Sequence, residues 1–144
     1  MERDGMTGIK VAGYAVGHFN NDLCASMWFV YLTYYLISVV KTSESVAGAS
    51  VLSGQFADGL MTPVVGILSD MFDTPCGKRT PWYIFGTIFV IPTFLGIFIY
   101  PPGINDICAL GEEGCTAGEV KNPTLQAAWY ITLPALFNVG WAAV

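Results

Sequence analysis

Two short polar stretches interrupt long apolar runs in this sequence, and their side chains could bind a proton or a small cation. The first, GHFNNDLCASMW, stands at 17–28, and the second, GQFAD, stands at 54–58. On a helix, residues three, four or seven apart share a face, so each stretch would present its polar groups on one stripe. Carboxylate and amide oxygens accept hydrogen bonds and bind cations, and a carboxylate or an imidazole can take up a proton. The candidate binding residues are His18, Asn21, Asp22, Gln55 and Asp58.

The histidine and the two aspartates could also have a purely structural role. His18 stands one turn before Asp22, and an imidazole with an ordinary pKa of about 6.5 could relay a proton to it. A hydrogen-bonded histidine that only packs is equally compatible with the pattern. An aspartate within a membrane could also pair with a basic residue to fix packing. The apolar runs contain no Lys or Arg to act as that partner, which favours a binding role for Asp22 and Asp58.

The composition indicates which elements must position these side chains. The chain has 144 residues, of which 53% are hydrophobic and 12% are charged, and its mean hydropathy is +0.54. A soluble domain carries about 25% charged residues, so this chain is poor in charge and is expected to lie in a membrane, in contact with lipid. The net charge of -5 and the scattered six Lys and Arg argue against a nucleic-acid partner.

The apolar runs predict membrane-spanning helices, each of which needs about 20 residues. Thr80-Pro81 and Asn122-Pro123 each place a residue type that favours the helix N-cap before a proline, and proline is tolerated in the first helical turn. The expected fold class is therefore an all-α integral membrane protein with four transmembrane helices in one partial domain, 1–144. The predicted helices span 11–40, 46–69, 81–100 and 123–144.

The charges near the ends of these helices predict their orientation. Lys and Arg favour the cytoplasmic side, so the N-terminus and the loop with Lys78 and Arg79 should lie there. The loop at 101–122 then faces the lumen or the exterior. It holds Cys108 and Cys115, which an oxidising compartment could join in a disulfide, with two free thiols as the alternative.

The stretch VVGILSDMFDTPCGKRTPWYIFGT, at 64–87, carries a recognisable loop motif. Its members are Gly66, Asp70, Gly77, Lys78 and Arg79. They are arranged as in the loop between helices 2 and 3 of the major facilitator superfamily. With YAVGHFNNDLCASMWFVYL, GQFADGLMTPVVG and PALFNVGWAAV, the chain resembles the sugar-cation symporter branch of that superfamily. The resemblance implies that the four helices form part of an N-terminal six-helix half.

The resemblance also implies an activity and roles for the residues above. It implies a secondary active transporter of the cation-coupled symporter type, which works by alternating access around a site near the middle of the membrane. Asp22 and Asp58 would bind the coupling cation, proton or sodium, together with the solute. The loop motif would act as a gate, because Lys78 and Arg79 could form charge-assisted hydrogen bonds with Asp70 in one state only. Simple cytoplasmic anchoring by these cations is the alternative.

The substrate and the extent of the chain follow only from the resemblance. One group within the branch is associated with cysteine import and lysosome-related organelles, which implies cysteine or another small polar solute and a lysosomal or related membrane. A sugar and the plasma membrane remain alternatives. Family members have twelve helices, so we expect this chain to be the first third of a transporter, inactive alone and partnered by the remainder of the transporter chain.

Two other classes of function compete with transport. A four-helix membrane scaffold, or a truncated protein that regulates longer relatives, would need no polar stripes at Asp22 and Asp58. An enzyme is not expected, because the sequence has a single His and lacks a nucleophile–base pair, a glycine-rich phosphate loop and a metal-ligand set. No cofactor beyond the coupling ion is expected.

Overall fold

The computed structural model describes residues 8–72, 74–75, 77–109, 116 and 118–144. In the first helix it does not describe the side chains at 10, 14, 17, 18, 20 and 21. All the named elements are helical, which confirms the predicted all-α class. They are α1 (Gly8–Ser26), η1 (Met27–Tyr31), α2 (Leu32–Tyr34), η2 (Tyr35–Val39), α3 (Glu44–Met71), α4 (Thr80–Phe98) and α5 (Pro123–Trp141).

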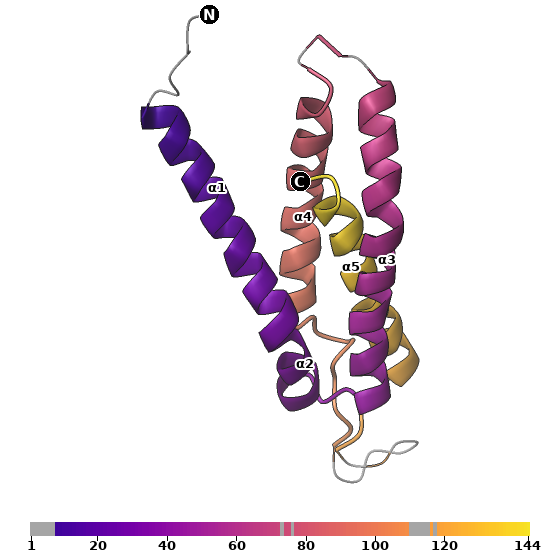
Figure 1. Cartoon of the computed structure of the whole chain (residues 1–144). Coiled ribbons are helices and arrows are strands. Elements are labelled where there is room, and N and C mark those ends of the chain that lie inside the picture. The colour runs from indigo at the N-terminus through magenta and orange to yellow at the C-terminus, as the bar shows by residue number, and fades with distance from the viewer. Residues whose placement is uncertain (1–7, 73, 76, 110–115, 117) are drawn as a thin grey trace, which may run out of the picture.

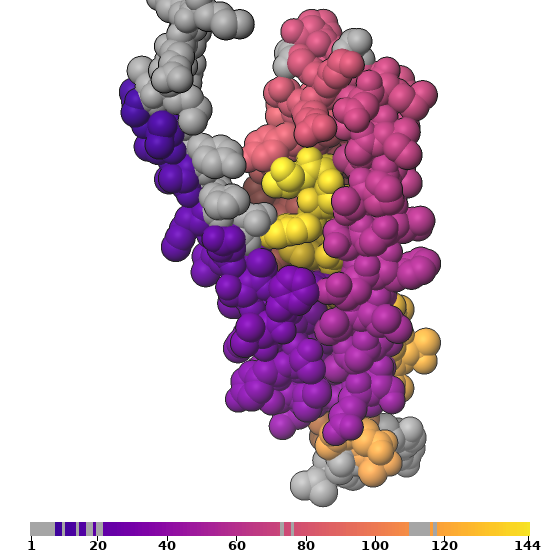
Figure 2. Space-filling view, viewed as in Figure 1, coloured from indigo at the N-terminus to yellow at the C-terminus, as the bar shows by residue number. Residues whose placement is uncertain are grey.

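The helices run up and down between two ends of the molecule (Figure 1). The start of α1 and the α3–α4 connection lie at the upper end of the view, and the connections that precede α3 and α5 lie at the lower end. The helix α5 packs against both α3 and α4. The N-terminal half of α1 stands apart from this bundle, whereas the turns that follow it lie against α3 (Figure 2). The segment from α1 to η2, then α3, α4 and α5, therefore alternate in direction, as consecutive membrane spans do.

Three helical stretches are long and apolar enough to cross a membrane. They are Asp22–Val39, Glu44–Met71 and Thr80–Phe98. The fourth predicted span, 123–144, forms α5 but is not among the qualifying stretches in the described part of the chain. Its apolar character is reduced by buried polar residues, Gln126 and Asn138, which face other helices. Three stretches are thus candidate spans by length and composition, and the fourth span and the six-helix half stay predictions.

Local chemistry explains several helix ends that differ from the predicted ones. The helix α3 begins at Glu44 because the Ser43 hydroxyl accepts a hydrogen bond from the Val46 amide, at 3.3 Å, and Glu44 places a negative charge in the first turn. The sequence interpretation overlooked this cap. At α4 the N-cap is Arg79, so Thr80 lies inside the helix with Pro81 and is not the cap that the Thr-Pro pair predicted.

The hydrophobic core lies where the helical turns after Ser26 meet α3, α4 and α5. Two of these turns, η1 and η2, are π-helical, and such turns change which side chains face a neighbouring helix. The buried core residues include Trp28, Leu32, Tyr35, Leu36, Ala47, Ile97, Tyr130 and Phe137.

A buried hydrogen-bond network closes the lower end of the bundle. The Asn105 amide donates to the Tyr130 hydroxyl at 2.9 Å, and the Gln126 amide donates to Asn105 Oδ1 at 3.0 Å and to the Val40 carbonyl at 3.2 Å. All four groups are buried. Because each buried polar group has a partner, the network ties the α4–α5 connection to α5 and to the end of η2 without leaving an unsatisfied group.

Candidate functional site

A small cavity lies between α3, α5 and the first helical segment, which runs from α1 to η2. Its volume is about 40 Å³, which is enough for a water molecule. It lies beside one of the predicted intramembrane carboxylates. The lining residues are Ala25, Trp28, Phe29, Gln55, Asp58, Phe137, Asn138 and Trp141. This cavity combines aromatic walls with amide and carboxylate groups.

The polar side of the cavity comes from α3 and α5. Gln55 and Asp58 stand three residues apart on α3, so both reach the same side of the helix. Asp58 is half-buried and accepts a hydrogen bond from the Thr62 hydroxyl at 3.3 Å. Asn138 is buried on α5, and its amide donates to the Pro134 carbonyl at 2.9 Å. The side-chain oxygens of these residues can accept hydrogen bonds or bind a cation.

The aromatic side of the cavity is built around Trp28. This residue lies in η1, is 3% exposed, and stacks on Phe137 with ring centroids 5.3 Å apart. A Cβ at Gly54 would lie 2.3 Å from Trp28 Cζ2 and 2.6 Å from Asn138 Nδ2. Glycine at 54 is therefore what allows the indole and the amide to lie directly on α3.

In the described part of the chain, the residues predicted from the first polar stretch do not line this cavity. Asp22 is exposed and does not line the cavity, and its main-chain carbonyl accepts a hydrogen bond from the Ser26 hydroxyl at 2.8 Å. The side chains of His18 and Asn21 lie outside the described residues. Among the described side chains, the first helical segment contributes Ala25, Trp28 and Phe29 to the cavity that Gln55 and Asp58 line. Binding roles for the five predicted residues stay predictions.

Six of the eight residues that line this cavity are not among the predicted site residues. They are Ala25, Trp28, Phe29, Phe137, Asn138 and Trp141. The available signal was Asn138, an amide in the middle of an apolar run and four residues after Pro134. The approach of Trp28 could not be predicted, because the π-helical turn changes the face on which it points.

The charged members of the predicted loop motif do lie together. Arg79 Nη2 is 3.6 Å from Asp70 Oδ1, and Lys78 Nζ donates to the Asp70 main-chain oxygen at 3.5 Å. Gly77 has φ of 100°, a conformation that favours glycine, and the Thr74 hydroxyl donates to its carbonyl. A Cβ at Gly66 would meet nothing within 4 Å, so close packing does not explain that glycine.

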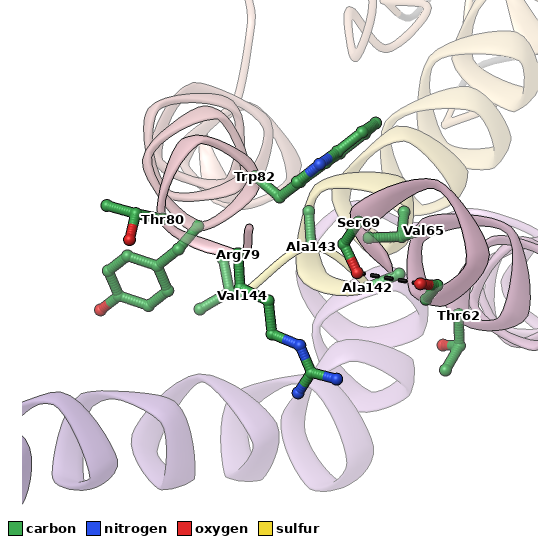
Figure 3. A pocket seen from close by; sticks show the side chains of 11 residues that line it. Thr62, Val65, Ser69, Arg79, Thr80, Trp82, Ala142, Ala143 and Val144 are labelled. Carbon is green, nitrogen blue, oxygen red and sulfur yellow. Dashed lines mark hydrogen bonds between the residues drawn. The ribbon is translucent and has the colours of Figure 1, made fainter. Parts of the chain in front are cut away.

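An open pocket of about 520 Å³ lies beside this motif. It is lined by residues of α3, by the first turn of α4 with Arg79, and by 142–144 after α5. Figure 3 shows Trp82 and Ser69 on either side of Ala143, with the Ser69 hydroxyl hydrogen-bonded within α3. The Asp70–Arg79 pair is exposed, so it contributes less than about 1 kcal/mol to stability.

The connection between α4 and α5 is ordered by main-chain pairing around one of the predicted cysteines. The Cys108 amide donates to the Glu119 carbonyl at 2.8 Å, and the Gly118 amide donates to the Cys108 carbonyl at 3.0 Å. Cys108 is buried and disulfide-bonded. Cys115 lies outside the described residues, so its pairing with Cys108 stays a prediction.

The spans and the carboxylate beside the cavity define a multi-pass membrane protein. A family model described as "MFS/sugar transport protein" matches residues 13–141, and the chain belongs to this family. Membership confirms the major facilitator superfamily resemblance, and this family consists of transporters rather than enzymes.

Curated relatives point in the same direction. The chain is 43% identical to major facilitator superfamily domain-containing protein 12 of Equus caballus and 42% identical to that of Homo sapiens, in each case over 90% of this chain and 25% of the relative. It is 29% identical to an uncharacterized symporter of Synechocystis sp. over 60% of this chain and 19% of the relative. The chain therefore spans about a quarter of the length of the first two relatives. No solved structure matches it.

Proposed function

We propose that the full-length protein that contains this chain is a secondary active transporter, of the cation-coupled symporter type, for a small polar solute. The observation that carries the proposal is Asp58, a half-buried carboxylate in an apolar helix that lines a cavity with Gln55 and Asn138. Among the residues that the structure describes, no basic side chain lines the cavity. A carboxylate at membrane depth without a cationic neighbour is suited to bind a proton or sodium.

Asp22 and its neighbours complete the proposed site. Asp22 lies at the start of the first stretch apolar enough to cross a membrane, and it is exposed on the surface of the described helices. In the full-length protein this surface would face further helices, with His18 and Asn21 on the same segment. Asp22 would then approach the solute from the side opposite Asp58, as sites between transporter helices require.

Cysteine is the first solute to test, and a lysosomal or related membrane is the proposed location. Both rest on the resemblance of this chain to the group that is associated with cysteine import and lysosome-related organelles. The similarity of the chain to the equine and human relatives supports that resemblance. The description of the matching family also names sugar transport, so a hexose is the second solute. The remainder of the full-length chain supplies the other helices that alternating access needs.

Replacing each carboxylate tests the proposal. In the full-length protein, Asp58→Asn or Asp22→Asn should lower cation-dependent uptake of labelled L-cysteine, or of a labelled hexose, by more than about tenfold, because a charged hydrogen-bond partner is lost. Uptake would be measured in vesicles across an imposed proton or sodium gradient. Surface labelling or protease protection would check that the variants still insert.

The matched control is Asp106→Asn in the α4–α5 connection. Asp106 is exposed and accepts a hydrogen bond from the Gly103 amide at 3.0 Å, away from the cavity. It should retain uptake. If both Asp22→Asn and Asp58→Asn transport as well as Asp106→Asn, the proposed roles of the carboxylates are wrong, and a scaffold function becomes the better account.

A further inference from the structure

Within the part of the chain that the structure describes, one buried donor in the cavity with Asp58 has no partner. Trp28 Nε1 is the buried side-chain nitrogen or oxygen that makes no hydrogen bond within the described part of the chain. Trp28 lines the cavity and is 3% exposed. Buried polar groups in native proteins are nearly always hydrogen-bonded, so an indole N–H left in this position indicates an acceptor beyond the described residues.

The surrounding contacts hold this indole in place. Its ring stacks on Phe137 with an interplanar angle of 29° and lies directly over Gly54. The main chain of η1 is π-helical at this point, a feature that is frequent at functional sites. The N–H is therefore held in position before any ligand arrives, and preorganised groups bind with a smaller loss of entropy.

The chemistry of the donor limits what it can bind. An indole nitrogen donates one hydrogen bond and accepts none, so its partner must be an acceptor and cannot be a metal cation. The cavity also presents the Asp58 carboxylate, which favours a cation or a donor. One side of the cavity therefore suits an oxygen acceptor, and the other suits a positive or proton-bearing group.

We propose that the Trp28 indole N–H hydrogen-bonds an oxygen acceptor held in this cavity. The acceptor is either an oxygen of the transported solute or a resident water molecule beside Asp58. The first source deepens the proposed transport function and rests on it. The second source does not depend on transport, because a cavity of about 40 Å³ with several polar partners can hold water.

The first experiment observes the donor directly. Full-length protein in lipid nanodiscs would carry ¹⁵N-labelled tryptophan, and the Trp28 indole signal would be assigned by its loss in Trp28→Phe. A signal that shifts when L-cysteine or D-glucose is added supports the solute as acceptor. A signal that stays in place but exchanges magnetisation with water supports resident water. A signal with neither response, at the position of a free indole N–H, overturns the proposal.

The second experiment separates lost hydrogen bonding from lost packing. Trp28→Phe keeps an aromatic ring and removes the donor, so the KM for L-cysteine uptake should rise about tenfold if the solute carboxylate is the acceptor. The KM for cysteamine, which lacks the carboxylate, should not change. An equal rise for both solutes, or no rise for either, overturns the solute assignment. Trp129→Phe is the matched control, because its indole donates to the Gly96 carbonyl at 3.2 Å outside the cavity.

The two experiments distinguish failure of this proposal from failure of the proposed function. If wild-type protein takes up neither L-cysteine nor cysteamine while the Trp28 signal responds to water, the choice of solute is wrong and the donor assignment stands. If the Asp58→Asn variant loses uptake, Trp28→Phe transports normally, and the Trp28 signal of the wild-type protein responds to neither solute nor water, transport stands and the role of Trp28 is wrong.

Discussion

Single atoms decide the contact between the first helical segment and the helices it meets. At Gly54, the absence of a Cβ is what admits both the Trp28 ring and the Asn138 amide. The other glycines of α3, namely Gly48, Gly59 and Gly66, would each place a Cβ in open space. Close helix approach therefore requires glycine at one of these four positions, where three helices meet.

Gly54→Ala should lower the free energy of unfolding by about 1–3 kcal/mol, as overpacking of a close contact does. The added methyl group would lie 2.3 Å from Trp28 Cζ2, so the indole or the helix must shift. Thermal unfolding of the full-length protein in detergent would measure the change. Gly59→Ala is the control and should be neutral or slightly stabilising, because alanine favours the helix. Equal melting temperatures for the two variants would contradict the contact.

At the scale of the element, the α3–α4 connection combines a rigid turn with weak ionic contacts. Gly77 takes a left-handed conformation, and its amide donates to the Thr74 carbonyl at 2.9 Å. Asp70 and Arg79 are both exposed to solvent, and exposed ion pairs contribute little to stability. A contact of this kind can form and break at small cost, which suits a gate that opens in each transport cycle.

Asp70→Asn in the full-length protein should therefore change the rate of uptake without changing stability. We expect uptake to fall severalfold, because the carboxylate that pairs with Arg79 is lost, while the melting temperature stays within about 1 °C, as for other surface substitutions. The charge exchange Asp70→Arg with Arg79→Asp should recover part of the rate. A normal uptake rate in Asp70→Asn would favour simple cytoplasmic anchoring by Lys78 and Arg79.

At the scale of the whole molecule, the surface of the described chain is strongly apolar. The helix α1 exposes Ile9, Val16, Phe19 and Leu23 along its length, and each is more than half exposed. Exposed apolar side chains that gather on one helix mark contacts with lipid or with other protein segments. Since the curated relatives are about four times as long, we expect further helices of the full-length protein to cover part of this surface.

The up-and-down arrangement predicts which loops face the cytoplasm. Lys78 and Arg79 place the α3–α4 connection there, and Figure 1 places the α4–α5 connection at the opposite end. A glycosylation acceptor inserted after Gly103 should therefore receive a glycan, whereas one inserted after Thr74 should not. Glycosidase-sensitive shifts on a gel would report both. A glycan on the second insertion alone would show that the orientation is reversed.

Some of the fold and of the site was predictable from local patterns. Hydropathy and length predicted the helices, because each must bury its main-chain polar groups within itself to lie in lipid. Helix periodicity placed Gln55 and Asp58 on one side of α3, and both line the cavity. The same reasoning placed Asp22 on a polar stripe but could not say what that stripe faces. Asp22 is exposed in the described chain because the packed face of this segment is the one that carries Trp28, Leu32 and Leu36.

The sequence by itself indicated that this protein lies in a membrane, that it is helical and which family it belongs to, since these properties depend on composition, periodicity and short motifs. Only the tertiary structure decided that Trp28 contacts Gly54, that Asn138 lines the cavity with Asp58, and that the Trp28 indole nitrogen is buried without a partner among the described residues. The physical reason is that these contacts join residues far apart in the chain. They depend on π-helical turns and on helix packing, which no local pattern in the sequence encodes.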